Sequence, residues 1–457
     1  MSAALLQAWA KTLRRCGDER AVVQAADGAA VTFRELDARA TAWCAAHATR
    51  GLAGRAVVFA APNGIGWFEI FLGLLKAGAV AVPLDAAEPV AAQRGLAEAL
   101  RAGFWWEGGR LVPLGEKWRP RDFGRRAHGR DARATPCLIK LTSGTTGQPQ
   151  PLVLTAAQLL ADARQVTATM GIGPRDLNYA LIPLGHSYGL GNLTLPLLAQ
   201  GVPLVCGASP LPQVIAADFA RWKPTVFPGV PAVWRALAAA EVEPRALESL
   251  RLGISAGAPL ATEVARDFAA RFGRRLHGFY GSSETGGIAY DRSGEATLAG
   301  GVGRAMRGVR LMVLRGEKLR VSSAAVVTRG NRRRVGKLGA WVMADRVARD
   351  ARGRLTLLGR RGTTVKIAGR RVNLAEVAAR LRRLSGVREA WVGVSAGAEP
   401  VLGAVVVADR PVAELRVALH ADTVAWKIPK KWAAVAALPL TARGKTDMRA
   451  LHARLFG

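Results

Sequence analysis

The sequence predicts an α/β protein with a large N-terminal domain of doubly wound, mostly parallel sheets plus a β-rich subdomain, followed by a small α+β C-terminal domain. Short apolar runs alternate with amphipathic stretches between residues 57 and 280, which predicts the sheets and their helices. From residue 300 to 358, short strands separated by turns predict the β-rich subdomain. The pattern changes again around Gly359–Gly362, so we place the domains at residues 1–361 and 362–457.

The first elements are indicated by a helix cap and by apolar runs. Residues 1–16 have the pattern of an amphipathic helix, and a second helix is expected to run from the capping box of Thr32 and Glu35 to about Ala46. A strand, a helix and a strand follow at a spacing that predicts a crossover unit in a parallel sheet. These three elements are expected at Val57–Ala60, Trp67–Lys76 and Ala79–Pro83. We assign no element to residues 101–133.

The stretch Leu141–Pro151 combines glycines with four hydroxyl side chains. The apolar runs Cys137–Ile139 and Leu152–Leu154 flank it, which predicts two strands joined by an exposed loop. Glycines allow the backbone to bend and to turn several N–H groups toward one anion. The loop is therefore a candidate phosphate site, and by itself it is equally an ordinary glycine turn.

Alternation continues after this loop and predicts that ligands bind at the carboxyl ends of the strands, where the loops of a doubly wound sheet gather. Strands are expected at Tyr179–Pro183, Leu204–Cys206, Thr225–Pro228, Leu252–Ser255 and Leu276–Tyr280. Helices are expected at Ala156–Met170, up to Lys223, at Val230–Ala240 and at Leu260–Phe272.

The C-terminal third is expected to begin with strands and to end in the small α+β domain. The β-rich subdomain should include strands at Arg310–Leu314 and Leu355–Leu358. The α+β domain should contain helices at Leu374–Leu384, at Ala413–His420 and from about Asp447, with strands at Ala390–Val394 and Leu402–Val407.

The formal charge of +31 raises the question of nucleic-acid binding, because polyanions bind basic surfaces by releasing counterions. The arginines are scattered singly or in pairs, with Arg332–Arg334 the only run of three, and they do not interleave with aromatic residues as in single-strand binders. We expect no nucleic-acid function. A basic surface does favour acidic partners, such as a nucleotide or an acidic acyl carrier protein.

The cysteines are widely spaced and match neither a metal-binding pattern nor a disulfide framework. They are Cys16, Cys44, Cys137 and Cys206. Reduced thiols in the cytoplasm are the simplest account. The basic residues of the segment 1–16 follow its apolar residues, the reverse of a secretory signal, and the most apolar stretches are interrupted by proline or polar residues. We expect a cytoplasmic protein without a membrane span.

Later segments add charged groups suited to phosphate chemistry. Gly278–Gly286 is typical of a strand ending in a glycine turn that presents Glu284, and a carboxylate beside a phosphate loop can hold Mg²⁺. A surface glutamate in a turn is the ordinary alternative. Lys445 lies in a late glycine turn, where Gly444–Thr446 imitates the end of a P-loop signature. That signature fails because its first glycine would fall on Pro439.

Together, these segments resemble the adenylate-forming superfamily, which includes acyl- and aryl-CoA ligases, nonribosomal-peptide adenylation domains and luciferases. They occur in the family's order and at roughly its spacing, from Thr32–Leu36 to Lys445. The resemblance implies that the small C-terminal domain is mobile and that ATP and Mg²⁺ are used. It also implies that a carboxylic acid is activated as an acyl-adenylate with release of pyrophosphate, and that the acyl group then passes to the thiol of coenzyme A or an acyl carrier protein.

The resemblance implies a role for each matching residue. The ATP phosphates are assigned to Thr142, Ser143, Gly144, Thr145, Thr146 and Gly147. Adenine and ribose are assigned to Gly257, Ala258, Pro259, Tyr280, Gly281, Asp345 and Arg360. Glu284 is assigned to Mg²⁺, and His186, Ser187, Phe227, Gly229, Ser255 and Ala256 to the acyl pocket. Catalysis is assigned to Lys445, His186, Glu284 and Thr145, with Lys445 bridging the attacking carboxylate and the α-phosphate.

The chain departs from the family pattern at several of these positions. Gln150 and Pro151 stand where the family has Lys and Gly, Gly362 stands where it has Asp or Lys, and Met343–Ala344 replaces Thr-Gly before Asp345. These departures leave open a degenerate, non-catalytic member that binds acyl or nucleotide ligands.

One position bears on the substrate. Amino-acid-activating members carry an Asp where this chain has Ser187, and serine cannot pair with an α-ammonium group. An aryl or acyl acid is therefore favoured over an amino acid.

Overall fold

The computed structural model describes residues 3–115, 135–142, 150–327, 338–360, 364–367, 370–395, 400–423, 425–441 and 446–457. The chain divides into two compact units. The first unit is Met1–Met312, Arg320–Trp341 and Asp350–Leu355, and the second is Val313–Leu319, Val342–Arg349 and Thr356–Gly457. The α/β class is confirmed, whereas the predicted domain boundary between residues 361 and 362 stays a prediction.

The larger sheet of the first unit has nine strands in the order β15-β14-β13-β12-β11-β9-β10-β1-β2. From β13 to β1, each strand runs parallel to the next one in this order. At one edge β15, β14 and β13 pair antiparallel, and at the other edge β2 pairs antiparallel with β1. The strands are β1 (Arg20–Gln24), β2 (Ala30–Thr32), β9 (Asn178–Ala180), β10 (Leu204–Cys206), β11 (Val226–Gly229), β12 (Leu252–Ser255), β13 (Leu276–Ser282), β14 (Gly286–Tyr290) and β15 (Arg304–Ala305). This is the predicted mostly parallel sheet.

The second sheet of this unit has the order β6-β5-β3-β4-β7-β8. Its inner strands β5, β3, β4 and β7 are parallel, and β6 and β8 pair antiparallel at its edges. The strands are β3 (Ala56–Ala60), β4 (Val80–Leu84), β5 (Phe104–Glu107), β6 (Arg110–Pro113), β7 (Pro136–Thr142) and β8 (Gln150–Thr155). The parallel pairing of β3 with β4 confirms the predicted crossover unit.

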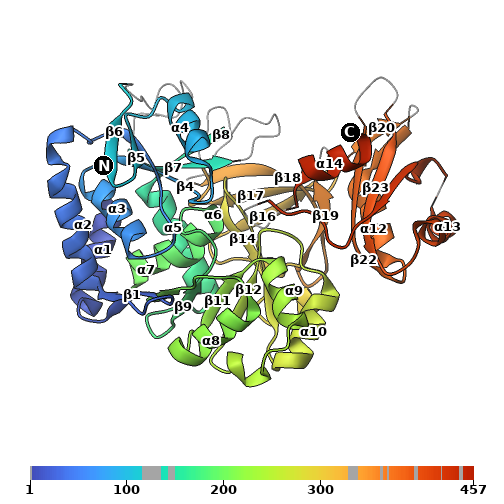
Figure 1. The fold of residues 1–457 in the computed structure, drawn as a ribbon, viewed down its shortest axis with the longest axis horizontal. Helices are drawn as coiled ribbons and strands as arrows, with labels where there is room; N and C mark the ends of the chain where they lie inside the picture. The colour runs from blue at the N-terminus through green and yellow to red at the C-terminus, as the bar shows by residue number, and fades with distance from the viewer. Residues whose placement is uncertain are drawn as a thin grey trace. The chain divides into compact units, whose positions relative to one another are not determined.

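Two helices of the first unit lie between these sheets. α3 (Ile65–Lys76) contacts β4 of the smaller sheet and β1 of the larger one, and α5 (Ala156–Met170) contacts β7 and β14. Helices α8 (Pro212–Trp222), α9 (Pro231–Ala239) and α10 (Thr262–Phe272) lie beside β11 and β12 (Figure 1) and enclose an aromatic core with them. The remaining helices are α1 (Ala3–Cys16), α2 (Phe33–Ala46), η1 (Ala48–Arg50), α4 (Val90–Ala99), α6 (Ser187–Gly189), the π-helix η3 (Leu190–Thr194), α7 (Leu195–Gln200), η4 (Pro244–Leu247) and α11 (Glu295–Leu298).

The described residues of the later part of the chain form small sheets and short helices. Strands β16 (Arg310–Leu314), β17 (Lys318–Ser323), β18 (Gly339–Arg349) and β19 (Leu355–Arg360) form a four-stranded sheet, which is the predicted β-rich region. Beyond it are the hairpin of β20 (Thr364–Ile367) and β21 (Arg370–Asn373), and a sheet of β22 (Val387–Val394), β23 (Leu402–Ala408) and β24 (Lys431–Ala434). The α-helices are α12 (Leu374–Arg383), α13 (Val412–Asp422) and α14 (Met448–Phe456), and a short 3₁₀ turn, η5 (Ala425–Lys427), lies between the last two.

Local signals account for several element ends. The capping box at α2 is present, since the Glu35 amide donates to Thr32 Oγ1 at 3.1 Å and the Thr32 amide to Glu35 Oε2 at 2.8 Å. The strand predicted at Tyr179–Pro183 is shorter in the structure, where β9 ends at Ala180. Within residues 101–115 the structure has the β5–β6 hairpin, which turns at Gly108 and Gly109, and both glycines have positive φ.

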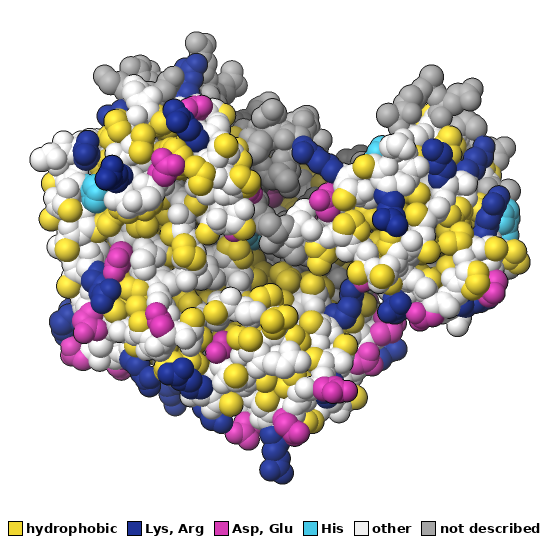
Figure 2. Space-filling view, viewed as in Figure 1, with side chains coloured by type: hydrophobic (Ala, Val, Ile, Leu, Met, Phe, Trp, Pro, Cys, Tyr) yellow, Lys and Arg dark blue, Asp and Glu magenta, His cyan; other side chains and the backbone are white. Residues whose placement is uncertain are grey.

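The charged residues, the cysteines and the apolar helices can be located in the structure. Figure 2 shows Lys and Arg side chains dispersed among acidic and neutral side chains on the face in view. The four cysteines are all free thiols. Over the described ranges, we find no helix that combines the length and the hydropathy needed to cross a membrane.

Candidate functional site

The predicted phosphate loop joins two adjacent strand ends. β7 and β8 pair antiparallel with Thr142 opposite Gln150 and Leu141 opposite Pro151, which confirms the predicted arrangement of strand, loop and strand. The assigned residues Ser143, Gly144, Thr145, Thr146 and Gly147 lie outside the described residues, as does the side chain of Thr142. Their role in binding phosphate stays a prediction, but both ends of the loop are fixed by the strand ladder.

Glu284 lies in the tight turn between β13 and β14. The Val327 amide donates to the Glu284 carbonyl at 2.8 Å, and within the turn the hydroxyls of Ser282 and Thr285 are 3.1 Å apart. Gly281 fits because a Cβ there would lie 2.9 Å from the Gly286 carbonyl oxygen. Glu284 is half-buried, and its turn is held through backbone and hydroxyl contacts.

The Glu284 turn is also tied to the segment predicted to line the acyl pocket. The hydroxyls of Ser187 and Ser283 are 2.7 Å apart. The next residue, Tyr188, is buried and its hydroxyl donates to the Ile254 carbonyl at 3.0 Å. His186 precedes α6 and is half-buried. Residues from three distant parts of the sequence therefore meet at the carboxyl edge of the larger sheet.

The ends of β11 and β12 supply the small residues predicted for the pocket. The Ala256 amide donates to the Gly229 carbonyl at 3.3 Å, which links the two strand ends. Ser255 is 4% exposed, and its hydroxyl has no hydrogen-bond partner in the described part of the chain. A buried, unpaired hydroxyl at a strand end is a group that a bound ligand can satisfy.

Phe227 has a different place from the one predicted. Its ring is fully buried and packs against the rings of Tyr179, Phe219 and Trp234 in the aromatic core. It supports β11 from the side covered by the helices. We therefore treat Phe227 as a core residue and not as part of the pocket.

The residues predicted to bind adenine lie at the same sheet edge. β12 and β13 are parallel with Ser255 opposite Gly278, so the segments that follow these residues emerge together. Gly257, Ala258 and Pro259 are exposed on the first of these segments, and Gly257 has a φ of +90°, which favours glycine. Tyr280, near the end of β13, is 8% exposed. The exposed turn and the aromatic residue thus belong to neighbouring strands of the larger sheet.

The other predicted nucleotide residues belong to the second unit. Asp345 is a half-buried residue of β18, and Arg360 ends the neighbouring strand β19, although its side chain is not described. Lys445 lies outside the described residues, and Leu440 and Thr446 form an isolated antiparallel bridge. The roles of these three residues stay predictions.

Two buried charges lie near the Glu284 turn, and the sequence alone does not single them out. Lys140, near the end of β7, and Asp162, in the middle of α5, are each 5% exposed. The Lys140 ammonium interacts electrostatically with the carboxylates of Asp162 and Glu284. The signal in the sequence was a charged residue inside the apolar run Leu138–Leu141 and another inside the apolar helix α5.

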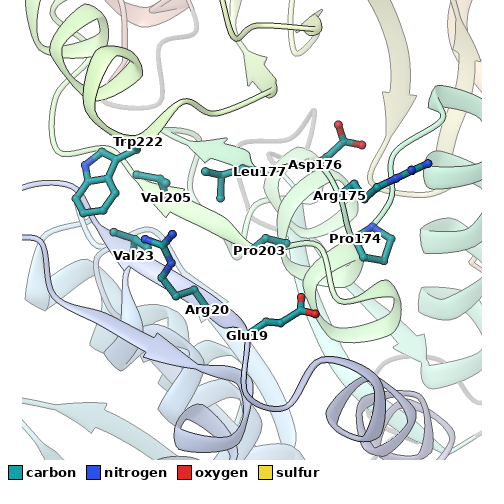
Figure 3. Close-up of a pocket in the computed structure, with 10 residues that line it drawn as sticks. All are labelled: Glu19, Arg20, Val23, Pro174, Arg175, Asp176, Leu177, Pro203, Val205 and Trp222. Carbon is teal, nitrogen blue, oxygen red and sulfur yellow. The ribbon is translucent and has the colours of Figure 1, made fainter.

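A hollow of about 240 Å³ lies at the opposite, amino edge of the larger sheet (Figure 3). Its lining includes Arg20, Leu177 and Pro203 at the starts of β1, β9 and β10. The Asp176 carboxylate in its wall accepts hydrogen bonds from the Thr225 hydroxyl at 2.9 Å and from Arg251 at 2.9 and 3.0 Å. Its buried charge is therefore used within the fold.

Comparisons with known proteins identify the family of the chain. A model of the AMP-binding enzyme family matches residues 9–104 and 113–330. The 2-hydroxy-7-methoxy-5-methyl-1-naphthoate–CoA ligase of Streptomyces carzinostaticus is 29% identical over 345 residues, which cover 69% of this chain and 62% of that protein. The benzoate–CoA ligase of Thauera aromatica is 28% identical over 193 residues, 42% of this chain and 37% of that protein. The matches thus cover less than two thirds of either ligase.

Solved structures share the fold over nearly the whole chain. The crystal structure of ATP-bound MatB from Rhodopseudomonas palustris matches with a TM-score of 0.82 at 22% identity, covering 98% of both chains.

Proposed function

The chain belongs to the AMP-binding enzyme family, and on that premise we propose that it activates a carboxylic acid with ATP and then transfers the acyl group to a thiol. One observation carries the proposal. The ends of the phosphate loop, the turn of Glu284 and the exposed turn Gly257–Pro259 all belong to the first unit and follow strand ends or join them. The naphthoate and benzoate ligases that the chain resembles are named for this chemistry.

In the proposed site, ATP lies across the carboxyl edge of the larger sheet. Its adenine would pack between Tyr280 and the exposed turn Gly257–Pro259, beside Gly281. Its phosphates would lie in the loop Thr142–Gly147, where backbone N–H groups and hydroxyls donate to the phosphate oxygens. Asp345 would accept hydrogen bonds from the ribose hydroxyls, and Arg360 would contact the ribose and phosphates.

Mg²⁺ fits this arrangement, with Glu284 as its protein ligand. Among the residues that the structure describes, no three His, Cys, Asp or Glu side chains are grouped to hold a metal. A single half-buried carboxylate suits Mg²⁺, which takes most of its ligands from phosphates and water. When bound, the cation neutralises charge on the phosphates of ATP.

The chemistry proceeds in two balanced steps. The carboxylate oxygen of the acid attacks the α-phosphorus, and the bond from this phosphorus to the bridging oxygen breaks, which releases pyrophosphate. Lys445 stabilises the negative charge that gathers between the carboxylate and the α-phosphate. A thiol sulfur then attacks the acyl carbon, its proton is lost, and AMP leaves.

The pocket favours an acid without an α-amino group. Ser187 is held by Ser283 and offers a hydroxyl where an ammonium group would need a carboxylate. Gly229, Ser255 and Ala256, at the ends of β11 and β12, would line the acyl pocket together with His186. A flat aromatic acid fits small residues backed by the ring of Tyr188. The acceptor thiol belongs to coenzyme A or an acidic acyl carrier protein. The domain 1–361 would bind ATP and the acid, and the domain 362–457 would supply Lys445.

The test is carboxylate-dependent exchange of labelled pyrophosphate into ATP, measured over aromatic and aliphatic acids. We expect exchange with an aromatic acid and a loss of at least about 100-fold in Lys445→Ala, since Lys445 acts on developing charge. Lys430→Ala removes an exposed lysine of the same unit and should leave the rate unchanged.

Two results would contradict these assignments. An unchanged exchange rate in Lys445→Ala would remove the role given to that lysine. ATP binding by calorimetry without exchange for any acid would establish a binding-only family member, which is the alternative that Gln150 and Pro151 favour.

A further inference from the structure

Lys140 and Asp162 are two opposite charges buried in the first unit, next to groups of the proposed site. Each is 5% exposed, which is rare for Lys and Asp unless they are paired. Lys140 lies two residues before the end of β7, at the entrance to the phosphate loop. Asp162 is in α5, the helix that contacts both β7 and β14. Neither residue has a part in the proposed reaction.

The Asp162 carboxylate has a close-fitting site made by glycines. Its Oδ1 accepts a hydrogen bond from the Gly287 amide at 2.9 Å. A Cβ at Gly286 would clash with Oδ1. Gly286 also has a φ of +69°, so both the space and the backbone conformation disfavour a side chain there. A Cβ at Gly191 would lie 3.1 Å from Oδ2. Asp162 therefore anchors the first residues of β14, directly after the turn of Glu284.

Lys140 is the buried cation that both carboxylates, Asp162 and Glu284, act on. Burial lowers the pKa of Lys140, while the carboxylates of Asp162 and Glu284 raise it. Burial raises the pKa of Asp162, while Lys140 and the Gly287 amide lower it. Asp162 thus supplies the counter-charge that Lys140 needs. Without Asp162, Glu284 would be the remaining carboxylate that attracts the ammonium group.

Other contacts of α5 show that this helix supports the whole turn. Gln158 Nε2 donates to the Val326 carbonyl at 3.0 Å, and the next residue, Val327, donates its amide to the Glu284 carbonyl. Asp162 and Gln158 are four residues apart and therefore lie on one face of the helix. One face of α5 therefore contacts Gly287, which follows the turn, and Val326, which precedes the residue bonded to Glu284.

We propose that Lys140 and Asp162 form a buried positioning pair that fixes the turn of Glu284 and keeps its carboxylate available for Mg²⁺. The proposal rests on the function proposed above for Glu284. Groups that orient a metal ligand commonly change metal affinity by 10- to 100-fold when they are removed. The pair should therefore set how much Mg²⁺ the reaction requires, in addition to stabilising the fold.

Three variants separate this role from a purely structural one. Asp162→Asn keeps the shape and can still accept from Gly287, but it leaves Lys140 without its counter-charge. Lys140→Met keeps much of the length, and the double variant removes both charges. The matched control is Asp176→Asn, which disturbs another buried acid at the far edge of the sheet.

Two measurements are made on each folded variant. The first is the Mg²⁺ concentration that gives half-maximal pyrophosphate exchange, which should rise about tenfold in each single variant and return to within about threefold in the double variant. The second is amide hydrogen exchange at residues 283–287 without ligands, which should be about tenfold faster in Asp162→Asn and unchanged in Asp176→Asn. An unchanged Mg²⁺ requirement and unchanged amide exchange in Asp162→Asn would overturn the proposal.

The design also separates this proposal from the proposed function. If the wild-type protein exchanges no pyrophosphate, the proposed function fails, and amide exchange at residues 283–287 decides the role of the pair in fixing the turn. If Asp162→Asn does not fold, Lys140→Arg replaces it, because it keeps the charge and moves its position. A Mg²⁺ requirement equal to that of the wild type in Lys140→Arg would then count against the pair.

Discussion

The molecule buries carboxylates at both edges of its larger sheet, and it satisfies them differently. At the amino edge, Asp176 accepts from the Gly173 amide, the Thr225 hydroxyl and two nitrogens of Arg251, all within 3.0 Å. At the carboxyl edge, Asp162 accepts from the Gly287 amide and otherwise has the electrostatic attraction of Lys140. Where hydrogen bonds are complete, a buried charge serves the fold. Where a buried charge makes few hydrogen bonds, as Asp162 does, polar groups around it are available to bind a ligand.

Among the substitutions that test this difference between the two edges, the largest loss of pyrophosphate exchange is expected at Glu284. Glu284→Gln keeps the shape of the turn and removes the charge proposed to bind Mg²⁺, so pyrophosphate exchange should fall on the order of 100-fold with little change in stability. Steady-state exchange and thermal unfolding check this. Glu248→Gln, which removes an exposed carboxylate paired with Lys223, is the control and should affect neither. Equal rates in Glu284→Gln and the wild type would remove the distinction between the edges.

A smaller effect is expected at the amino edge, where a substitution should lower the stability and leave pyrophosphate exchange unchanged. Asp176→Asn weakens the hydrogen bonds to Arg251 and Thr225, but Arg251 is 46% exposed and water can solvate it. The free energy of unfolding should therefore fall by only about 1–2 kcal/mol. Exchange per folded molecule should not change. Denaturant unfolding measures the first quantity, and a large loss of exchange at full folding would show that the amino edge takes part in catalysis.

The smallest effect is a pH dependence of stability from His277, the second residue of β13. Its Nδ1 is 2.8 Å from the Asp291 carbonyl oxygen, and burial lowers its pKa from the ordinary value of 6.5. The unfolded chain then binds the proton more readily than the folded one, so the stability from neutral His277 is present above about pH 6.5. It is lost as the pH falls below that value toward the folded pKa.

Unfolding curves between pH 5 and 8 check this dependence. His277→Gln should reduce the loss of stability on the acid side. A wild-type curve of the same steepness as the variant's would show that His277 makes no contribution.

Much of this fold follows from local sequence signals. The capping box of Thr32 and Glu35 begins a helix where predicted, and the helix Ala156–Met170 and strand Leu252–Ser255 have their predicted ends. The hairpin of β5 and β6 was missed although the dipeptide Gly108–Gly109 is a known hairpin signal. The arginines and tryptophans around that dipeptide hid the alternation.

The site was less predictable because its contacts join distant segments. Phe227 lies in a strand that is buried on both faces, and alternation cannot tell which face meets the pocket in such a strand. Lys140 and Asp162 come together only because α5 lies between two sheets, which no local pattern reports. By contrast, Glu284 was recognised because a glycine turn after a strand places it at the carboxyl edge.

The measurement that tests the central claim most directly is the detection of the acyl-adenylate itself. The protein is incubated with ATP, Mg²⁺ and an aromatic carboxylic acid without a thiol, and the products are analysed by mass spectrometry. We predict an aryl-adenylate and pyrophosphate in equal amounts, with the adenylate replaced by AMP and a thioester when coenzyme A or a carrier protein is added. ATP that is bound and recovered intact with every acid of an aromatic and aliphatic panel would contradict the account.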